Sequence, residues 1–285
     1  METQSLTERV LRLVAIWLAI LFFMFPIFWI FLMSFQTNET ILRVPPSMVF
    51  EPTLVNYMGL ITGQLETAAG SLKIEFMSNL FNSMFLSTTS VAVGLLLGVP
   101  AAYAFARLKF RGSEDIAFTL LSFRFAPPLL VLLPLTIYFQ QIGLADTYVG
   151  LIWVYQLIVL PLILWIVRGY FEDIPADVEY AYRIAGHSWF STFWKIALPL
   201  ARPGIAAAGL LAFIFAWNNF IFALVLASAD KQPVTVGALA FVTASGIQYG
   251  QVAAGIVLSI APVFALALYA QRYLVEGLSL GAVKG

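Results

Sequence analysis

Cysteine is absent from the 285-residue chain, and histidine occurs once, at position 187. Without cysteine the chain can form neither disulfides nor thiolate metal sites, and a single histidine cannot build a metal centre. Charge is also scarce, because charged residues make up 11% of the chain, whereas a soluble domain has about 25%. The 15 basic and 15 acidic residues balance, so net charge indicates no nucleic-acid partner.

Two further absences limit the chemistry of the chain. No Gly-x-x-x-x-Gly-Lys-Ser/Thr pattern occurs, so the chain lacks the phosphate-binding loop that would hold ATP and Mg²⁺. The apolar segments contain no Ser/His, Asp/Asp or metal-ligand set, so an intramembrane enzyme is not expected. We expect no cofactor in this chain and no catalytic residue.

The chain is instead rich in long apolar runs, with 61% hydrophobic residues and a mean hydropathy of +0.91. About 20 apolar residues suffice to cross the hydrocarbon core of a bilayer as a helix. The sequence predicts an all-α integral membrane protein, a single domain over 1–285 with six transmembrane helices, the first retained rather than cleaved as a signal peptide. The six predicted spans are 13–35, 79–105, 116–139, 148–167, 204–227 and 252–270.

The basic residues predict the orientation of these spans, because lysine and arginine gather in cytoplasmic loops. With the N-terminus inside, eleven of the fifteen lie on the cytoplasmic side, three lie outside and Arg124 lies within a span. The eleven are Arg9, Arg12, Arg107, Lys109, Arg111, Arg168, Arg183, Lys195, Arg202, Arg272 and Lys284. Both termini are therefore expected in the cytoplasm.

Two predicted connections are long, 36–78 outside and 168–203 inside. The inner one predicts an amphipathic helix–turn–helix that starts near Pro175. Glycine tolerates a left-handed turn, so Gly186 is expected to end the first helix, and Ser188 is expected to cap the second. Pro199 and Pro203 are expected to end the second helix before the fifth span.

The residues alone leave two interpretations of 168–203 open. Such a segment can lie on lipid headgroups as an interfacial helix. It can also dock into a groove of a cytoplasmic partner through its apolar face.

Polar groups within the spans are the candidates for the translocation pathway. Arg124 precedes Pro127 and Pro128, which break the backbone hydrogen-bond ladder. No acidic residue lies deep in a span, so Arg124 is expected to pair with backbone carbonyls, a partner chain or the substrate, or to snorkel toward the cytoplasm.

Asn218 and Asn219 lie near the middle of the fifth span, beside Trp217. Amide and indole groups suit the hydroxyls and the apolar face of a sugar. The same amides could equally form hydrogen bonds between helices.

The run EYAYRIAG, at 179–186, and the LP at 198–199 resemble the signature loop of ABC-importer permeases. Glu179, Ala181, Gly186 and Pro199 match that loop, while Tyr180, Tyr182 and Ala185 depart from it. The tail RYLVEGLSLGAVKG, at 272–285, and the WNNF at 217–220 resemble the maltose-type carbohydrate permeases, although Asn219 replaces a more usual acidic residue.

This resemblance implies the type I importer fold and a bacterial cytoplasmic (inner) membrane location. It implies a second homologous permease subunit in a heterodimer, two ATPase subunits that bind ATP and Mg²⁺, an extracytoplasmic solute-binding protein and a sugar-type substrate. The lipid bilayer surrounds the chain, and alternating access is the expected mechanism.

The resemblance assigns ATPase coupling to the 168–203 loop and an ATPase-interface role to the tail at 271–285, whose alternative is a frayed terminus. The coupling residues are Glu179, Ala181, Arg183, Gly186, His187, Trp189 and Pro199. The tail residues are Gly281, Ala282, Val283, Lys284 and Gly285.

An ion-coupled secondary carrier is the alternative function. Such a carrier needs an ionisable acid within the membrane as its coupling group, and the predicted spans contain none that is deep enough.

Overall fold

The computed structural model describes residues 6–45, 49–67, 70–108, 110–243 and 246–281. The chain forms two compact units, one of Met1–Met77 with Ala238–Ala261 and one of Ser78–Gly237 with Pro262–Gly285. Most of the described chain is helical, with two short antiparallel hairpins.

Four described helices are long and apolar enough to cross a membrane, and the number rises to six if each of two sharply bent helix pairs counts as one span. The four are α1 (Leu6–Met33), α4 (Phe76–Arg107), α7 (Tyr148–Asp173) and α14 (Tyr249–Gly281). They contain the predicted spans one, two, four and six, apart from the last two residues of span one. The all-α membrane fold is confirmed to this extent.

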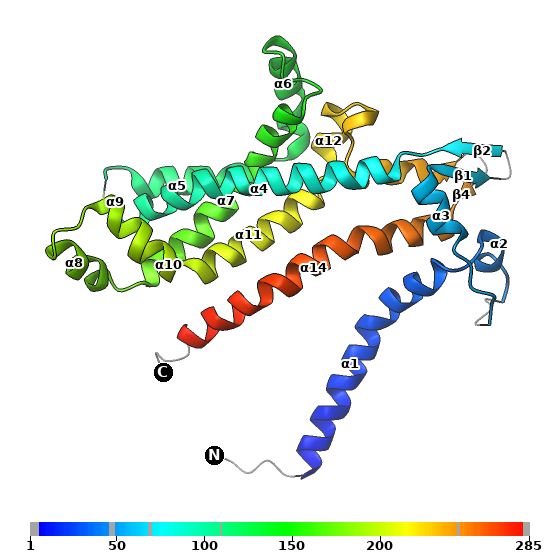
Figure 1. The fold of residues 1–285 in the computed structure, drawn as a ribbon, viewed down its shortest axis with the longest axis horizontal. Coiled ribbons are helices and arrows are strands. Elements are labelled where there is room, and N and C mark those ends of the chain that lie inside the picture. Colours follow the sequence, from blue (N-terminus) through cyan, green and yellow to red (C-terminus); the bar gives the residue numbers. More distant parts are fainter. Residues whose placement is uncertain (1–5, 46–48, 68–69, 109, 244–245, 282–285) are drawn as a thin grey trace. The chain divides into compact units, whose positions relative to one another are not determined.

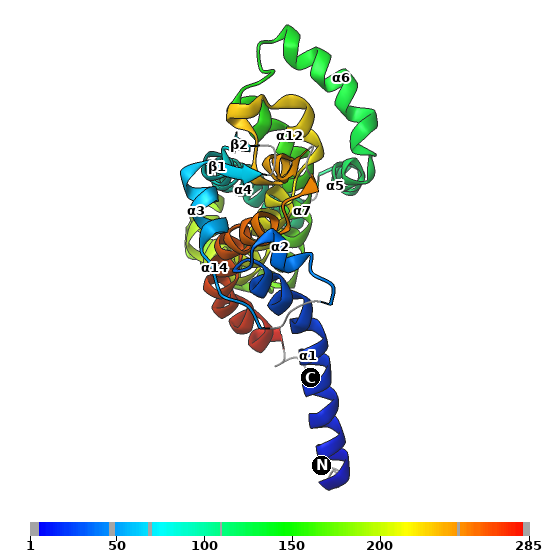
Figure 2. The same ribbon diagram turned by 90° about the vertical axis from the view of Figure 1, so that its right-hand side faces the viewer.

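The third predicted span is bent. It consists of α5 (Ser113–Ser122), a 3₁₀ turn (Phe123–Phe125) and α6 (Pro128–Gln141), with 97° between the two halves. Ala126 and Pro127 are extended at the bend, because two successive prolines cannot donate to the helical ladder. In Figure 2 α6 turns away from α5 at this point.

The fifth predicted span is interrupted. α11 (Arg202–Trp217) ends at the two asparagines, and α12 (Ile221–Leu226) follows after a short break. At 1.5 Å per residue the 16 residues of α11 extend only about 24 Å, which is less than the hydrocarbon core of about 30 Å.

Small residues let the helices of the second unit pack closely. α4, α7 and α11 lie alongside one another in Figure 1, and α11 packs along α7. A Cβ added to Gly94 of α4 would lie 2.5 Å from Val159 of α7, and one added to Gly204 of α11 would lie 2.2 Å from the ring of Tyr170. Close backbone approach of this kind replaces the hydrophobic effect as the source of helix association in lipid.

Hydrogen bonds attach the segment after α12 to the N-terminal part of α4. The Asn82 amide donates to the carbonyls of Asp230 (2.9 Å) and Gln232 (3.1 Å). The Asp146 carboxylate accepts from the backbone N–H and the hydroxyl of Ser228, and these bonds hold the pKa of Asp146 below its usual value. That segment continues as a 3₁₀ turn (Ala229–Lys231) and α13 (Val234–Gly237).

The first unit contains the long connection between α1 and α4. It forms α2 (Asn38–Ile41), α3 (Val55–Thr62) and a hairpin of β1 (Gln64–Thr67) with β2 (Gly70–Lys73). The buried Asn56 amide donates to the carbonyls of Ser34 (2.9 Å) and Gln36 (2.8 Å), which ties α3 to the end of α1. The rest of the unit is a 3₁₀ turn (Ala238–Phe241), the β3 (Val242–Thr243) and β4 (Gly246–Ile247) hairpin, and the start of α14.

We predict that Gly204→Ala destabilises the protein whereas Gly209→Ala does not. The new methyl at 204 would overlap the Tyr170 ring, an overpacking that costs about 1–3 kcal/mol. A Cβ at Gly209 would meet Leu95 at 3.6 Å, an ordinary contact, and alanine favours the helix. Thermal unfolding of the assembled complex in detergent measures both. Equal melting temperatures for the two variants would contradict this account of the α7–α11 contact.

Candidate coupling site and pathway residues

The predicted helix–turn–helix is present between α7 and α11. α8 (Ala176–Ile184) begins directly after Pro175 and is followed by Gly186 at φ +94°, a conformation that favours glycine. The Ser188 hydroxyl accepts from the N–H of Ser191 (3.2 Å) and caps α9 (Trp189–Thr192). The roles predicted for Gly186 and Ser188 are confirmed.

After α9 come a π-helical turn (Phe193–Ala197) and α10 (Leu198–Leu200), and a 72° bend then leads into α11. The prediction that Pro199 and Pro203 end the second helix before the fifth span is confirmed, because the helical run stops at Leu200, between the two prolines. Pro203 lies in the first turn of α11, where a missing N–H costs no hydrogen bond.

Glu179 faces the helix bundle and is 2% exposed. Its carboxylate accepts from the Tyr103 hydroxyl (2.8 Å) and from Arg107 Nε (2.9 Å), both on α4. Arg107 also donates through Nη2 to the carbonyl of Ile174 (2.8 Å), just before α8. We call Tyr103, Arg107 and Glu179 the anchor cluster. The N-terminal half of α8 is therefore attached to α4 at two points.

Two aromatic rings pack against the anchor cluster. The Tyr103 ring packs on Phe171 of α7, with centroids 5.2 Å apart, and on Phe193 of the π-helical turn, at 5.0 Å. Four elements thus converge on one buried carboxylate. Burial strengthens the ion pair, and it makes an unpaired Glu179 costly.

The opposite surface of the loop is exposed and apolar. Ile184 is 86% exposed and Phe190 is 73% exposed, and Trp189 lies beside them in the sequence. Ala181, Gly186 and His187 are exposed as well. We call Ile184, Gly186, His187, Trp189 and Phe190 the tip. Exposed apolar patches of this kind mark interaction sites.

Two stacked pairs hold the tip in shape. The His187 ring stacks on Tyr182 with centroids 3.9 Å apart. The Arg183 guanidinium lies 3.6 Å from the ring centroid of Trp189, a cation–π contact. Arg183 and His187 therefore support the tip within the loop, in addition to any contact with a partner.

The asparagines predicted for the pathway lie at the break between α11 and α12. Asn218 is exposed, and its amide donates to the Ile214 carbonyl (2.8 Å) one turn back. Asn219 is 7% exposed, and its Oδ1 has no hydrogen-bond partner among the described residues. Trp217 is buried and stacks on Phe213 at 5.6 Å. Neither amide bridges two spans in the described part of the chain.

Arg124 lies in the 3₁₀ turn at the bend between α5 and α6. Its guanidinium carbon is 4.3 Å from the ring centroid of Phe215 on α11. The sequence analysis did not anticipate this aromatic partner. The cation is thus held against the span that carries the two asparagines.

Gln156 of α7 is a buried polar residue that the sequence analysis missed. Its amide donates to the carbonyls of Ser90 and Ile152, each at 3.0 Å, while its Oε1 has no partner among the described residues. A glutamine within a predicted apolar span was the available signal. Of the tail residues, Gly281 is the last of α14, and Ala282, Val283, Lys284 and Gly285 lie outside the described residues.

Comparison with known proteins identifies this architecture. The family described as binding-protein-dependent transport system inner membrane component matches residues 94–279. The chain is 36% identical over 267 residues to the trehalose transport permease SugB of Mycobacterium tuberculosis, covering 91% of this chain and 92% of that protein. It is 31% identical to the trehalose/maltose permease MalG of Thermococcus litoralis, covering 99% of each.

Solved structures show the same fold. A chain of a bacterial ABC transporter involved in the import of the acidic polysaccharide alginate superimposes with a TM-score of 0.75 at 24% identity, over 96% of this chain and 99% of that one. A chain of the MetNI methionine ABC transporter gives a TM-score of 0.60 at 15% identity, over 70% and 95%.

The chain belongs to the binding-protein-dependent transport system inner membrane component family. It is a multi-pass membrane permease subunit of an ABC importer and not an enzyme.

We predict that Arg107→Met destabilises the protein by about 3–5 kcal/mol, because it leaves the buried Glu179 carboxylate without its cation. The double variant Arg107→Met/Glu179→Met should recover most of this loss, since an apolar pair of similar volume replaces the ion pair. Thermal unfolding of the purified complex is measured for wild type, Arg107→Met, Glu179→Met and the double variant. A double variant as unstable as the sum of two single variants would show that the pair does not act as a unit.

Proposed function

We propose that this chain, with a second permease subunit, forms the pathway of a sugar-type importer, and that the tip couples it to a cytoplasmic ATPase. The observation that carries the proposal is the division of the loop into two faces. One face is bound to α4 through the buried Glu179, and the other presents Ile184 and Phe190 to the exterior. The substrate class follows the trehalose, trehalose/maltose and maltodextrin permeases to which the chain is similar.

Coupling requires that a displacement of the tip reaches the spans. The anchor cluster supplies this connection, because the salt bridge and the Ile174 carbonyl contact fix α8 to α4 at two points. A displacement of Ile184 is then transmitted to α4, because α8 cannot move independently of that helix. The same movement reaches α11, whose first residue follows the bend after α10. Rocking of this bundle gives alternating access.

The energy comes from partner subunits in this proposal. The sequence holds no P-loop, so two ATPase subunits bind ATP and Mg²⁺ at the cytoplasmic side. Lysine and arginine favour the cytoplasm for both termini and for the tip. The tail, with Gly281, Ala282, Val283, Lys284 and Gly285, would extend from α14 along the ATPase interface. A solute-binding protein delivers the sugar from outside the inner membrane.

The apolar surface of α1 is compatible with a second membrane subunit beside this chain, which the proposal takes to be a homologous permease. Large apolar side chains along its length, from Val10 to Phe28, are more than 40% exposed. Such a surface requires lipid or a second membrane subunit. In the pathway, Asn218, Asn219, Trp217 and Arg124 supply the polar and aromatic groups near the break in the fifth span, where a sugar could exchange hydrogen bonds.

The substrate class is tested with the complete complex. Reconstituted with its binding protein and ATPases, it should hydrolyse ATP faster when trehalose or maltose is added, because only liganded binding protein should promote closure of the ATPases. Methionine is the matched control and should have no effect. Stimulation by methionine alone would reject a sugar importer, and transport without nucleotide would favour the ion-coupled carrier.

Coupling at the tip is tested by Ile184→Asp. A carboxylate in the docking face should weaken ATPase binding about 30-fold, which corresponds to the loss of one interface hot spot of about 2 kcal/mol. The matched control Ile184→Leu keeps the apolar surface and should behave as wild type. Pull-down of the ATPase and sugar-stimulated hydrolysis give the readout. Full coupling in the aspartate variant would remove the tip from the mechanism.

A further inference from the structure

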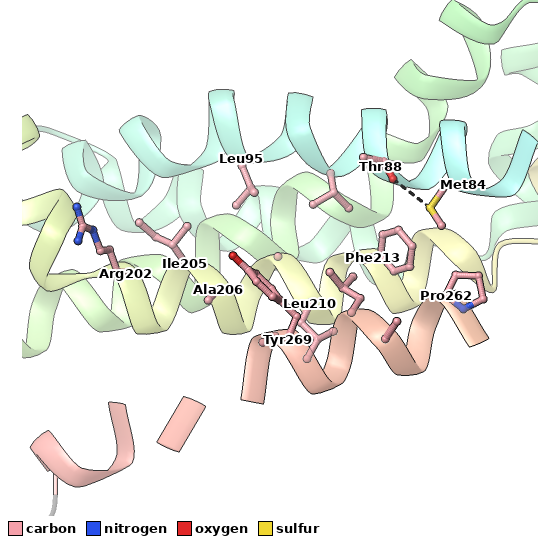
Figure 3. Close-up of a pocket in the computed structure, with 15 residues that line it drawn as sticks. Met84, Thr88, Leu95, Arg202, Ile205, Ala206, Leu210, Phe213, Pro262 and Tyr269 are labelled. Carbon is pink, nitrogen blue, oxygen red and sulfur yellow. Dashed lines mark hydrogen bonds between the residues drawn. The ribbon is translucent and has the colours of Figure 1, made fainter. Parts of the chain in front are cut away.

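A groove of about 670 Å³ lies within the second unit, between α4, α11 and the C-terminal half of α14. Leu95, Gly209, Leu210, Phe213 and Leu266 are among its walls. Figure 3 shows Arg202 at one end of the groove and Met84, Phe213 and Pro262 toward the other. None of the residues assigned above to coupling or to the pathway lines it.

The walls of the groove are apolar except at the Arg202 end and at two further polar residues, Thr88 and Tyr269. The Thr88 hydroxyl already donates to the sulfur of Met84, at 3.6 Å. A sugar would leave its hydroxyls unpaired against such walls, at a cost of several kcal/mol for each group. The groove is therefore suited to a hydrocarbon ligand.

Arg202 supplies one positive charge at the end of this groove. It is exposed, and within the described ranges no carboxylate lies within salt-bridge distance of it. A guanidinium binds phosphate oxygens through two parallel hydrogen bonds, which makes arginine the preferred partner of a phosphate. The charge complements an anionic headgroup.

The length of the groove matches one leaflet of a bilayer. Arg202 and Phe213 are eleven residues apart on the same helix, or about 16 Å at 1.5 Å per residue. Half of a hydrocarbon core of about 30 Å is about 15 Å.

We propose that this groove binds one acyl chain of an anionic phospholipid from the cytoplasmic leaflet, with the lipid phosphate paired to Arg202. The choice of leaflet rests on the orientation proposed above, and the groove itself does not depend on the identity of the transported sugar. The lipid would fill the space between α4, α11 and α14 and hold α14 against the other two helices.

Native mass spectrometry of the complete complex, titrated with phosphatidylglycerol or phosphatidylcholine, tests the proposal. Arg202→Gln should weaken phosphatidylglycerol binding roughly fivefold, because one basic residue at the surface contributes about that factor. It should weaken phosphatidylcholine binding less, because the choline cation already offsets the charge of the phosphate that Arg202 would pair with. Gly209→Leu should displace both lipids, since the added side chain enters the groove where a Cβ has room.

Arg111→Gln is the matched control, because Arg111 is an exposed cation on the same predicted side and does not line the groove. It should bind phosphatidylglycerol as wild type does. Equal binding by wild type and Arg202→Gln would overturn the proposal, as would equal binding of the two lipids by wild type. Cross-linking of Gly209→Cys, the sole thiol in the chain, to the second permease would also overturn it. Sugar-stimulated ATPase activity separates these failures from failure of the proposed function.

Discussion

The buried ion pair between Glu179 and Arg107 is the interaction on which the arrangement of α4, α7 and α8 around the loop depends. Withdrawing a carboxylate and a guanidinium from water costs several kcal/mol for each ion, and the cost is offset only when the geometry and the remaining hydrogen bonds are good. Tyr103 and the Ile174 carbonyl supply those bonds. Because this arrangement is satisfied in one orientation of α8, it determines which side of the loop remains exposed.

That orientation explains why two neighbouring residues of the same motif have different roles. Glu179 points into the bundle, while Ile184, more than one turn later, is 86% exposed. Between them Arg183 and Tyr182 stack on Trp189 and His187 and stiffen the turn at Gly186. A tip that is rigid and apolar can transmit force, whereas an interfacial helix on lipid headgroups would need no buried salt bridge beneath it. The ion pair therefore favours the docking interpretation.

Hydropathy predicted the positions of the spans, and local chemistry predicted the turn at Gly186 and the cap at Ser188. These features depend on residues adjacent in the sequence. The partners of Glu179 and Arg124 lie 72 and 91 residues away, on other helices, so no local pattern identifies them.

The break at Asn218 and Asn219 can be explained by treating α11 as a rigid helix whose two ends have different surroundings. Its N-terminal end packs tightly on α7, since a Cβ at Gly204 would overlap the Tyr170 ring. Its C-terminal end stops at the asparagines, where the Asn219 Oδ1 has no partner among the described residues. Buried polar atoms are stable only when paired, so this oxygen is expected to find water or substrate. In the proposed mechanism, a displacement of the loop moves α11, and the far end of α11 carries the polar side chains of Asn218 and Asn219.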